Sequence, residues 1–391
     1  MAINLIRNSR VFFTTNVDDR GRVRAGDYKD SNAHPFTVSN TWEIQVLEGM
    51  TFSQNTTTDT VTLSEAGDTP QRGQRSFNTA LEPLDFSFAT YLRPYNDAGT
   101  VTAEERLLWN AFAGAVPVGS AGAAWTNGSG NAASTLVMTN SNKHQLQAFG
   151  LIIVFDDVSY VLDNCALDTA TIDFGLDAIA SVQWAGKGTL IRQVVVAADK
   201  ASPVVLSGVD IATDVGDTGA ATAKNPLAKY IANKLSTLQV NDVINDFTGS
   251  DYTIALTGGS ITLSNNLTYL TPANLGVVNL PITYFTGTRA ISGNITAYLK
   301  TGSTNTAGLL QGLLDNAPNE INPSYAINIQ MGGGANSTRV DIKLPAAMLT
   351  IPTVNTEQVV STTINFTAQG YTGEAFDISQ ANEAVIEYRA A

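Results

Sequence analysis

The chain has 391 residues and a formal net charge of −13; only 15% of its residues are charged, whereas 43% are apolar. The acidic excess argues against a protein that binds nucleic acid tightly, because such proteins need a basic surface. No apolar run approaches the ~18 residues of a membrane helix, and "MAINLIRNSR" lacks a signal-peptide pattern. We therefore expect synthesis in a cytoplasm and no membrane anchor.

Alternation of apolar and polar residues predicts β-strands along most of the chain. In the first 200 residues this pattern, rich in β-branched and aromatic residues, occurs at Arg10–Asn16, Trp42–Gly49, Asp85–Leu92, Phe149–Phe155, Val158–Leu167 and Ile179–Gly186. The predicted fold class is mainly β.

One helix is indicated in the same region, at "TAEERLLWNAFAG" (Thr102–Gly114). Thr102 and Glu105 have the spacing of a capping box, and Gly114 is a C-terminal stop signal. The apolar residues between them would lie on one side of the helix and pack on a sheet.

The later part of the chain repeats the order of the earlier part. "YTIALTGGSITLSNN" resembles "WEIQVLEGMTFSQN", "GNITAYLK" resembles "FSFATYLR", and "VVSTTINFTAQG" resembles "DAIASVQWAGKG". A short helical stretch follows the second match in each copy, "AGLLQGLLDN" in the later one. Several matches in the same order predict a tandem duplication.

The duplication predicts two domains, 1–200 and 201–391, joined in the Ala- and Asp-rich stretch 196–226. Each domain would be a β-sandwich or half-barrel with one short helix. The first copy is the longer one, and its Gly- and Ala-rich segment 115–140 is interpreted as an exposed inserted loop.

Three pairs of residues coincide when the copies are aligned, and they are predicted to anchor the two cores. These pairs are Phe52 with Leu263, Tyr91 with Tyr298, and Trp184 with Phe366. Aromatic residues at matched strand positions are more often core residues than ligand contacts.

The sequence offers little for catalysis. Cys165 lies in an apolar-alternating stretch that indicates a buried, inert thiol, and His34 and His144 lack neighbours at metal-ligand or nucleophile spacing. "GKGT" resembles part of a phosphate-binding loop, but Ser181 stands where that pattern requires glycine. We expect no enzyme activity, no cofactor and no metal.

Acidic residues are concentrated in one stretch. Between His144 and Gly186 there is no Lys or Arg, yet the stretch contains Asp156, Asp157, Asp163, Asp168, Asp173 and Asp177. A solvated acidic face is the simplest interpretation. A turn is expected between Asp163 and Asp173, so only a subset of these aspartates would point the same way.

With this repeat, the chain resembles the major tail tube proteins of long-tailed siphophages, in the type whose subunit carries two tube domains. The resemblance is carried by "LIRNSRVFFTT", by residues 63–95, by "NNLTYLTP" and by "FTGTRAISGNITAYL". It covers residues 1 to about 370.

The resemblance implies a structural virion protein of the phage tail, made in the host cytoplasm. Three subunits would close a pseudo-hexameric ring of six similar domains, and stacked rings would form the hollow noncontractile tube that conducts DNA into the host. Implied partners are other copies of the chain, the tape measure protein, and tail tip and terminator proteins. The six aspartates become candidate lumen acids, since a wall that does not attract phosphate would let DNA pass.

Two other functions remain open. The inner tube of a contractile tail or secretion machine uses the same domain, but usually one per subunit. A virion carbohydrate-binding β-module would favour exposed aromatic residues in loops, for which Trp125 is the candidate.

Overall fold

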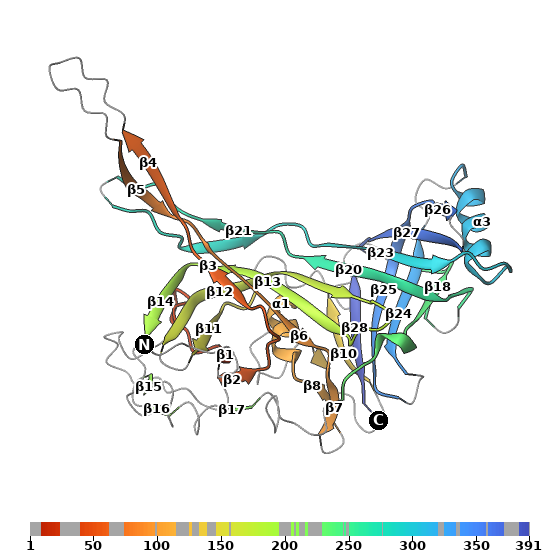
Figure 1. Cartoon of the computed structure of the whole chain (residues 1–391), viewed down its shortest axis with the longest axis horizontal. Helices are drawn as coiled ribbons and strands as arrows, with labels where there is room; N and C mark the ends of the chain where they lie inside the picture. Colours follow the sequence, from red (N-terminus) through yellow and green to blue (C-terminus); the bar gives the residue numbers. More distant parts are fainter. Residues whose placement is uncertain are drawn as a thin grey trace, which may run out of the picture.

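The structure is a computed structural model whose strands greatly outnumber its helices, so the mainly β fold class is confirmed (Figure 1). It describes residues 9–23, 40–61, 74–97, 100–114, 125–126, 133–138, 146–155, 158–194, 205–206, 209–210, 216–217, 229–244, 246–247, 250–275, 277–319, 324–333, 337–356, 359–370 and 383–390. We call residues 9–194 half 1 and residues 229–390 half 2.

Half 1 is built on a bent sheet in which one long strand is central. Its strands are β1 (Arg10–Thr14), β2 (Thr41–Ile44), β3 (Thr51–Ser53), β6 (Leu84–Tyr91), β11 (Phe149–Val154), β12 (Ser159–Asp173), β13 (Ser181–Gly188) and β14 (Leu190–Val194). They pair in the order β2-β1-β11-β12. The other edge of β12 carries β14 along its first part and β13 along its last part, and β6 and β3 follow β13.

Half 2 follows the same order. Its strands are β18 (Thr237–Asn241), β19 (Tyr252–Ile254), β20 (Leu256–Ser264), β23 (Ala290–Tyr298), β24 (Tyr325–Gly332), β25 (Arg339–Leu349), β26 (Thr353–Thr356), β27 (Val360–Ala368) and β28 (Ala384–Arg389). They pair as β19-β18-β24-β25, and β25 carries β28 along its first part and β27 along its last part. β23 and β20 follow β27, as β6 and β3 follow β13.

Hairpins and two α-helices complete the described structure. The helices are α1 (Arg106–Ala113) and α3 (Thr306–Asn316), with a 3-10 turn at Asn233–Leu235. The small strands are β4 (Thr56–Val61), β5 (Arg75–Leu81), β7 (Pro94–Asp97), β8 (Thr100–Ala103), β9 (Trp125–Thr126), β10 (Ser134–Met138), β15 (Val205–Leu206), β16 (Val209–Asp210), β17 (Gly216–Asp217), β21 (Leu267–Leu270) and β22 (Thr283–Thr286). The hairpins β4–β5 and β21–β22 extend from the body toward the same side (Figure 1).

One apolar core runs through both halves because the strands alternate in the predicted way. In β6, buried Leu84, Phe86 and Phe88 alternate with more exposed residues. Inside half 1, the Trp109 ring of α1 meets Trp184 of β13 edge-on, with ring centroids 4.7 Å apart. Cys165 lies fully buried in this core, as predicted, and burial raises the pKa of its thiol well above the ordinary value.

The predicted N-terminal cap of the first helix is wrong. The helix begins at Arg106, its N-cap is Glu105, and no side chain caps it. Thr102 instead pairs with Tyr95 in the β7–β8 hairpin. The stop at Gly114 is confirmed, since this residue has a left-handed backbone (φ 73°) that favours glycine.

The prediction that 115–140 is an exposed loop is wrong for its last part. Ser134–Met138 forms β10, in which Leu136 and Met138 are fully buried and the strand pairs with β28. Alternating apolar residues in "STLVM" place one face of this strand in the core, which the overall Gly and Ala content of the segment obscured.

The turn expected between Asp163 and Asp173 is also absent. Both residues belong to β12, which is continuous from Ser159 to Asp173. Register shifts opposite Gly150 and near Asp168, together with a positive φ of 49° at Asn164, bend the strand without ending it.

Candidate functional site: a strand junction and two open sheet edges

The two halves are joined by direct strand pairing. β11 ends opposite Cys165, and from Thr169 onward β20 of half 2 occupies the same edge of β12. The hydroxyl groups of Thr171 and Thr262 lie 3.2 Å apart across this ladder. The sheet of half 1 therefore continues into the sheet of half 2 (Figure 1).

A second connection runs through β28. This strand pairs with β25 of half 2 on one edge and with β10 of half 1 on the other. From β28, the Tyr388 hydroxyl accepts a hydrogen bond from Trp109 Nε1 (2.8 Å) and donates one to the Glu105 carboxylate. Backbone pairing and a buried side-chain network thus hold the halves together.

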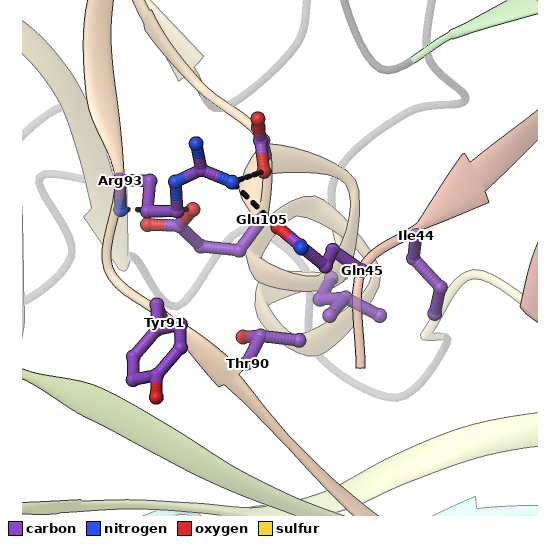
Figure 2. Close-up of a pocket in the computed structure, with 8 residues that line it drawn as sticks. Ile44, Gln45, Thr90, Tyr91, Arg93 and Glu105 are labelled. Atoms are coloured by element: carbon purple, nitrogen blue, oxygen red, sulfur yellow. Dashed lines mark hydrogen bonds and ion pairs between the residues drawn. The ribbon is translucent and has the colours of Figure 1, made fainter. Parts of the chain in front are cut away.

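Glu105 belongs to a buried polar group beside α1 (Figure 2). The neighbouring Arg93 guanidinium donates to Glu104 at 3.2 Å and also to Gln45, and it lies 4.6 Å from the centre of the Tyr230 ring. Burial raises the pKa of the Glu105 carboxyl to about 7, against the lowering effect of the Tyr388 hydrogen bond. The cavity that these residues line has a volume of about 10 Å³, room for one water molecule, so the contacts serve packing around α1.

Half 2 also caps elements of half 1. The Asn265 amide, at the end of β20, donates to the carbonyl oxygens of Phe112 (3.0 Å) and Leu167 (3.1 Å). At the base of the β21–β22 hairpin, the Tyr269 hydroxyl lies 2.8 Å from the carbonyl oxygen of Asn164 and 2.9 Å from that of Lys187. Backbone carbonyl oxygens at the C-terminal end of α1 and at the bend of β12 therefore receive hydrogen bonds from half 2.

The strand edges that form the β12–β20 junction have counterparts at the two ends of the molecule, and these counterparts have no partner among the described strands. In half 2, β24 ends opposite Ala347 and β25 itself ends at Leu349; β26, which continues along β27, pairs with no other strand in the described part of the chain. In half 1, β3 pairs with β6 on one side and with no described strand on the other. β26 thus lacks the neighbour that the last part of β12 has in β20, and β3 lacks the neighbour that β20 has in β12.

Apolar side chains are exposed around the open end of β25. Met348 is 41% exposed, Ile351 53% and Val359 60%. In half 1, the corresponding turn after β12 is partly covered by half 2: Phe174 N–H donates to the Gly259 carbonyl, and Asn233 N–H donates to that of Ala178. Exposed open edges with apolar surroundings are the features of a surface that pairs with another chain.

The predicted anchors differ in their burial. Trp184, Phe366 and Leu263 are fully buried or nearly so. Phe52 is partly buried and its ring lies 5.5 Å from that of Tyr160. Tyr91 is partly buried and Tyr298 is 53% exposed, so these two tyrosines are not buried anchors in the subunit.

The six candidate lumen acids are not equivalent. Asp156 and Asp157 lie outside the described residues. Asp163 is fully buried, where it accepts hydrogen bonds from Arg192 and from Val23 N–H, so the expectation that it lines a lumen is wrong. Asp168 is partly exposed and accepts the Leu267 N–H at 2.8 Å, and Asp173 and Asp177 are exposed.

Sequence reasoning missed Tyr388 and the β28 strand that carries it. The alternation in "AVIEYR" is the usual strand signal, with Ile386 and Tyr388 on the buried face. It also missed the pairing of β10 with β28, since nothing in either segment identifies the other as its partner.

The described residues offer no metal site: they contain no cluster of three or more His, Cys, Asp or Glu side chains. None of the helices described is long and apolar enough to cross a membrane.

Comparison with known proteins identifies the family. No family model matches the chain. The chain is 30% identical over 373 residues to the tail tube protein pb6 of Escherichia phage T5. The aligned region covers 94% of this chain and 73% of pb6. Such identity along nearly the whole chain extends over both halves and their junction. The chain therefore belongs to the major tail tube proteins of siphophages, and it is a structural protein of the virion tail.

Proposed function

We propose that three copies of the chain close a ring, and that stacked rings form the hollow tube through which DNA leaves the virion. The observation that carries this proposal is the β12–β20 junction, because the described strands also leave one unpaired edge of each type. β3 of one copy pairs with the open edge of β26 in the next copy, because β26 lies along β27 as the last part of β12 lies along β13. Three such contacts alternate with three internal junctions.

A tandem duplication of domains 1–200 and 201–391 is part of the same proposal. The shared strand order supports it. Tyr91 lies opposite Ser181, and Tyr298 lies opposite Ser361, so Tyr91 matches Tyr298 in this alignment. The same registers place Ile364 at the position of Trp184, and Phe366 two residues further on.

Fusing two domains in one chain supports ring formation on physical grounds. Half of the domain contacts become intramolecular, with a high effective concentration, and only half depend on association between chains. The tape measure protein and the tail tip and terminator proteins are the partners proposed for the tube and its ends. Assembly follows synthesis in the host cytoplasm.

Electron microscopy of the purified protein tests the proposal, with hollow tubes of stacked rings as the expected result. A double variant, Ser53→Cys with Thr353→Cys, tests the contact itself, because by register these positions match Thr262 and Thr171 of the internal junction. Cys165 is buried, so a short bismaleimide should act at the new thiols and yield a covalent trimer on a denaturing gel. Each single variant is the control and should give no trimer. Tubes in which the double variant gives no cross-linked chains would contradict the proposed contact.

The same images separate the alternatives. A carbohydrate-binding module would remain unassembled and would bind glycans. An inner tube of a contractile machine would be found inside a sheath in virions, and a noncontractile tube would be found without one.

A further inference from the structure

The residues just before half 2 proper, 229–233, dock on half 1, and we call them the inner arm. The Ile231 carbonyl accepts the Ala180 N–H at 2.8 Å, just before β13 begins. Asn233 N–H donates to the Ala178 carbonyl at 3.0 Å. The Ile231 side chain is only 2% exposed and belongs to the apolar core. The inner arm therefore packs on half 1 through both its backbone and an apolar side chain.

The inner arm also covers side chains at the end of β6. The Tyr230 ring meets Tyr91 edge-on, with ring centroids 5.2 Å apart, and the Arg93 guanidinium lies 4.6 Å from the centre of the Tyr230 ring. Leu92, between the two covered residues, is fully buried. Residues that lead into half 2 thus complete this edge of half 1.

Half 2 has a matching edge at the end of β23. In half 1, Leu92 N–H donates to the Ala180 carbonyl at 3.0 Å. In half 2, Leu299 N–H donates to the Val360 carbonyl at the same distance. The residue before each leucine is a tyrosine, and the residue after each leucine is a cation. The two edges are therefore equivalent places in the two halves.

The edge of half 2 is open in the single chain. Tyr298 is 53% exposed and Val359 is 60% exposed. Lys300 is exposed, whereas the matching Arg93 is buried, and Leu299 is only partly buried. The apolar surface that the inner arm hides on half 1 is thus accessible on half 2.

The start of the chain resembles the inner arm. Residues 5–8, "LIRN", have isoleucine and asparagine at the spacing of Ile231 and Asn233 in "YIAN". Residues 1–8 precede the first described residue and lead into β1. β1 pairs with β11 as β18 pairs with β24, so the two similar segments precede equivalent strands.

The lengths of the two sides also agree. Five positions separate Ile6 from Val11 in β1, and seven separate Ile231 from the matching Leu238 in β18. Counted between matched strand pairs, the turn from β26 to β27 spans eight positions and that from β12 to β13 spans ten. An arm that is two residues shorter would therefore meet a turn that is two residues shorter.

We propose that residues 1–8 form an outer arm that docks on half 2 of the preceding copy in the ring, with Ile6 in the place of Ile231 and Leu5 against Tyr298. This inference rests on the proposed function, in which β3 of one copy follows β26 of the preceding one. β26 lies at the far end of half 2, away from β1 (Figure 1). The outer arm therefore reaches this surface on a second copy of the chain.

Cross-linking tests the docking site. Leu5→Cys with Tyr298→Cys should give covalent trimers with a short bismaleimide, because the matched rings of the inner arm lie 5.2 Å apart. Cys165 is buried, so each single variant should give no trimer. A second control is Leu5→Cys with Asp19→Cys, whose second thiol lies in an exposed turn of half 1 and should not join chains.

The cross-links also separate the outer arm from the proposed function. Rings that cross-link through Ser53→Cys with Thr353→Cys, but not through Leu5→Cys with Tyr298→Cys, would overturn the outer arm and leave the ring intact. Wild-type protein that forms no rings would overturn both.

Substitutions at matched isoleucines separate folding from assembly. Ile231→Ala should lower the urea midpoint of the dissociated subunit, because this side chain is buried within one chain. Ile6→Ala should leave that midpoint unchanged, because its contact is with another copy. An equal loss in both variants would place residues 1–8 on their own subunit and overturn the proposal.

Charge in the arm tests its contribution to assembly. Ile6→Asp should raise the concentration at which half of the chains are in rings by about tenfold or more, because an apolar contact is lost and a carboxylate is desolvated. Arg7→Asp is the matched control, since its counterpart Ala232 is exposed in the inner arm, and it should assemble like wild type. Analytical ultracentrifugation measures both. Wild-type assembly of Ile6→Asp would contradict the outer arm.

Discussion

The two α-helices follow corresponding strands in chain order, α1 after β6 and α3 after β23, yet they pack differently, α1 against β12 and β10 and α3 against β19. In α1 every residue from Leu107 to Ala113 is buried, whereas in α3 only Thr306, Leu309 and Leu313 are. Half 2 covers α1 through Asn265 and Tyr388, while Leu314 of α3 remains 47% exposed. The burial of α1 is thus completed by half 2. For α3, the neighbour would be another copy of the chain.

The same comparison distinguishes the two kinds of junction in the proposed ring. The internal junction has β12–β20 pairing and the additional β10–β28 pairing. Among the described residues, half 2 has no strand between α3 and β24 that would correspond to β10. We therefore expect contacts between chains to be weaker than the contact within a chain, and assembly to be the step most easily broken.

The largest effect should come from placing charge at the open end of half 2. Ile351→Asp with Val359→Asp should abolish rings and leave a folded monomer, because burying unpaired carboxylates at the contact is costly. Analytical ultracentrifugation measures this. The matched control is Leu176→Asp with Ile179→Asp, in the turn of half 1 that stays exposed although half 2 is present. Rings formed by the first variant, or their loss only in the control, would contradict the comparison.

A loss of stability is expected when the buried acid of β12 is neutralised. Asp163→Asn should lower the free energy of unfolding by about 3 kcal/mol, because it leaves the Arg192 guanidinium without its paired carboxylate. Denaturant unfolding of the dissociated subunit measures this. Asp173→Asn, an exposed acid on the same strand, should change stability by less than about 0.5 kcal/mol. Equal effects would mean that Asp163 has no structural role of its own.

The Glu105 network should make stability depend on pH. The folded carboxyl has a pKa of about 7 and an ordinary value of 4.5. Between those values the unfolded chain loses a proton that the folded protein keeps, so the free energy of unfolding falls as pH rises. At 1.4 kcal/mol per pKa unit, the loss by pH 8 is about 3 kcal/mol.

Glu105→Gln should remove most of this fall, as measured by urea unfolding at pH 5, 6, 7 and 8. Glu82→Gln, at an exposed position, should keep the wild-type curve. A Glu105→Gln curve with the wild-type slope would assign the pH dependence to another group.

A smaller effect compares one feature of both halves directly. Gly186 faces Phe86 in half 1, and Gly293 faces Phe366 in half 2, so glycine and phenylalanine have exchanged strands. A Cβ at Gly186 would lie 2.4 Å from Phe86 Cζ, and one at Gly293 would lie 2.5 Å from Phe366 Cζ. Gly186→Ala and Gly293→Ala should each cost about 1–3 kcal/mol in thermal or denaturant unfolding.

The control for both is Gly370→Ala, where a Cβ would meet no atom within 4 Å. Similar losses in the two halves would support common ancestry of these strand pairs. A loss confined to one half would count against it.

Much of the fold was accessible from sequence because alternation is a local property. The strands that became β1, β6, β11 and β13 were predicted close to their observed bounds, and Gly114 ended its helix as expected. The predicted cap at Thr102 was wrong because Thr102 is a strand residue that pairs with Tyr95 across the β7–β8 hairpin. A local sequence pattern does not reveal that pairing.

The candidate site was less accessible because it depends on contacts between distant segments. Trp109 and Tyr388 are 279 positions apart, and only the fold brings them to 2.8 Å. Likewise, Asp163 and Asp173 both lie in a stretch of alternating apolar and polar residues, so their neighbours in sequence do not distinguish them. The burial of Asp163 depends on its distant partners Arg192 and Val23. Sequence located the acids correctly but could not separate a structural one from exposed ones.

The position of β28 has a consequence for the order of events during translation. β28 lies between β10 and β25, and both of those strands leave the ribosome earlier. Until residues 384–389 emerge, the slot between them is empty, and Glu105 and Trp109 lack the hydroxyl of Tyr388. A chain interrupted before this point would keep the β12–β20 pairing but lack the second connection between its halves. We therefore expect a subunit competent for assembly only after synthesis has passed both halves and β28 has been inserted.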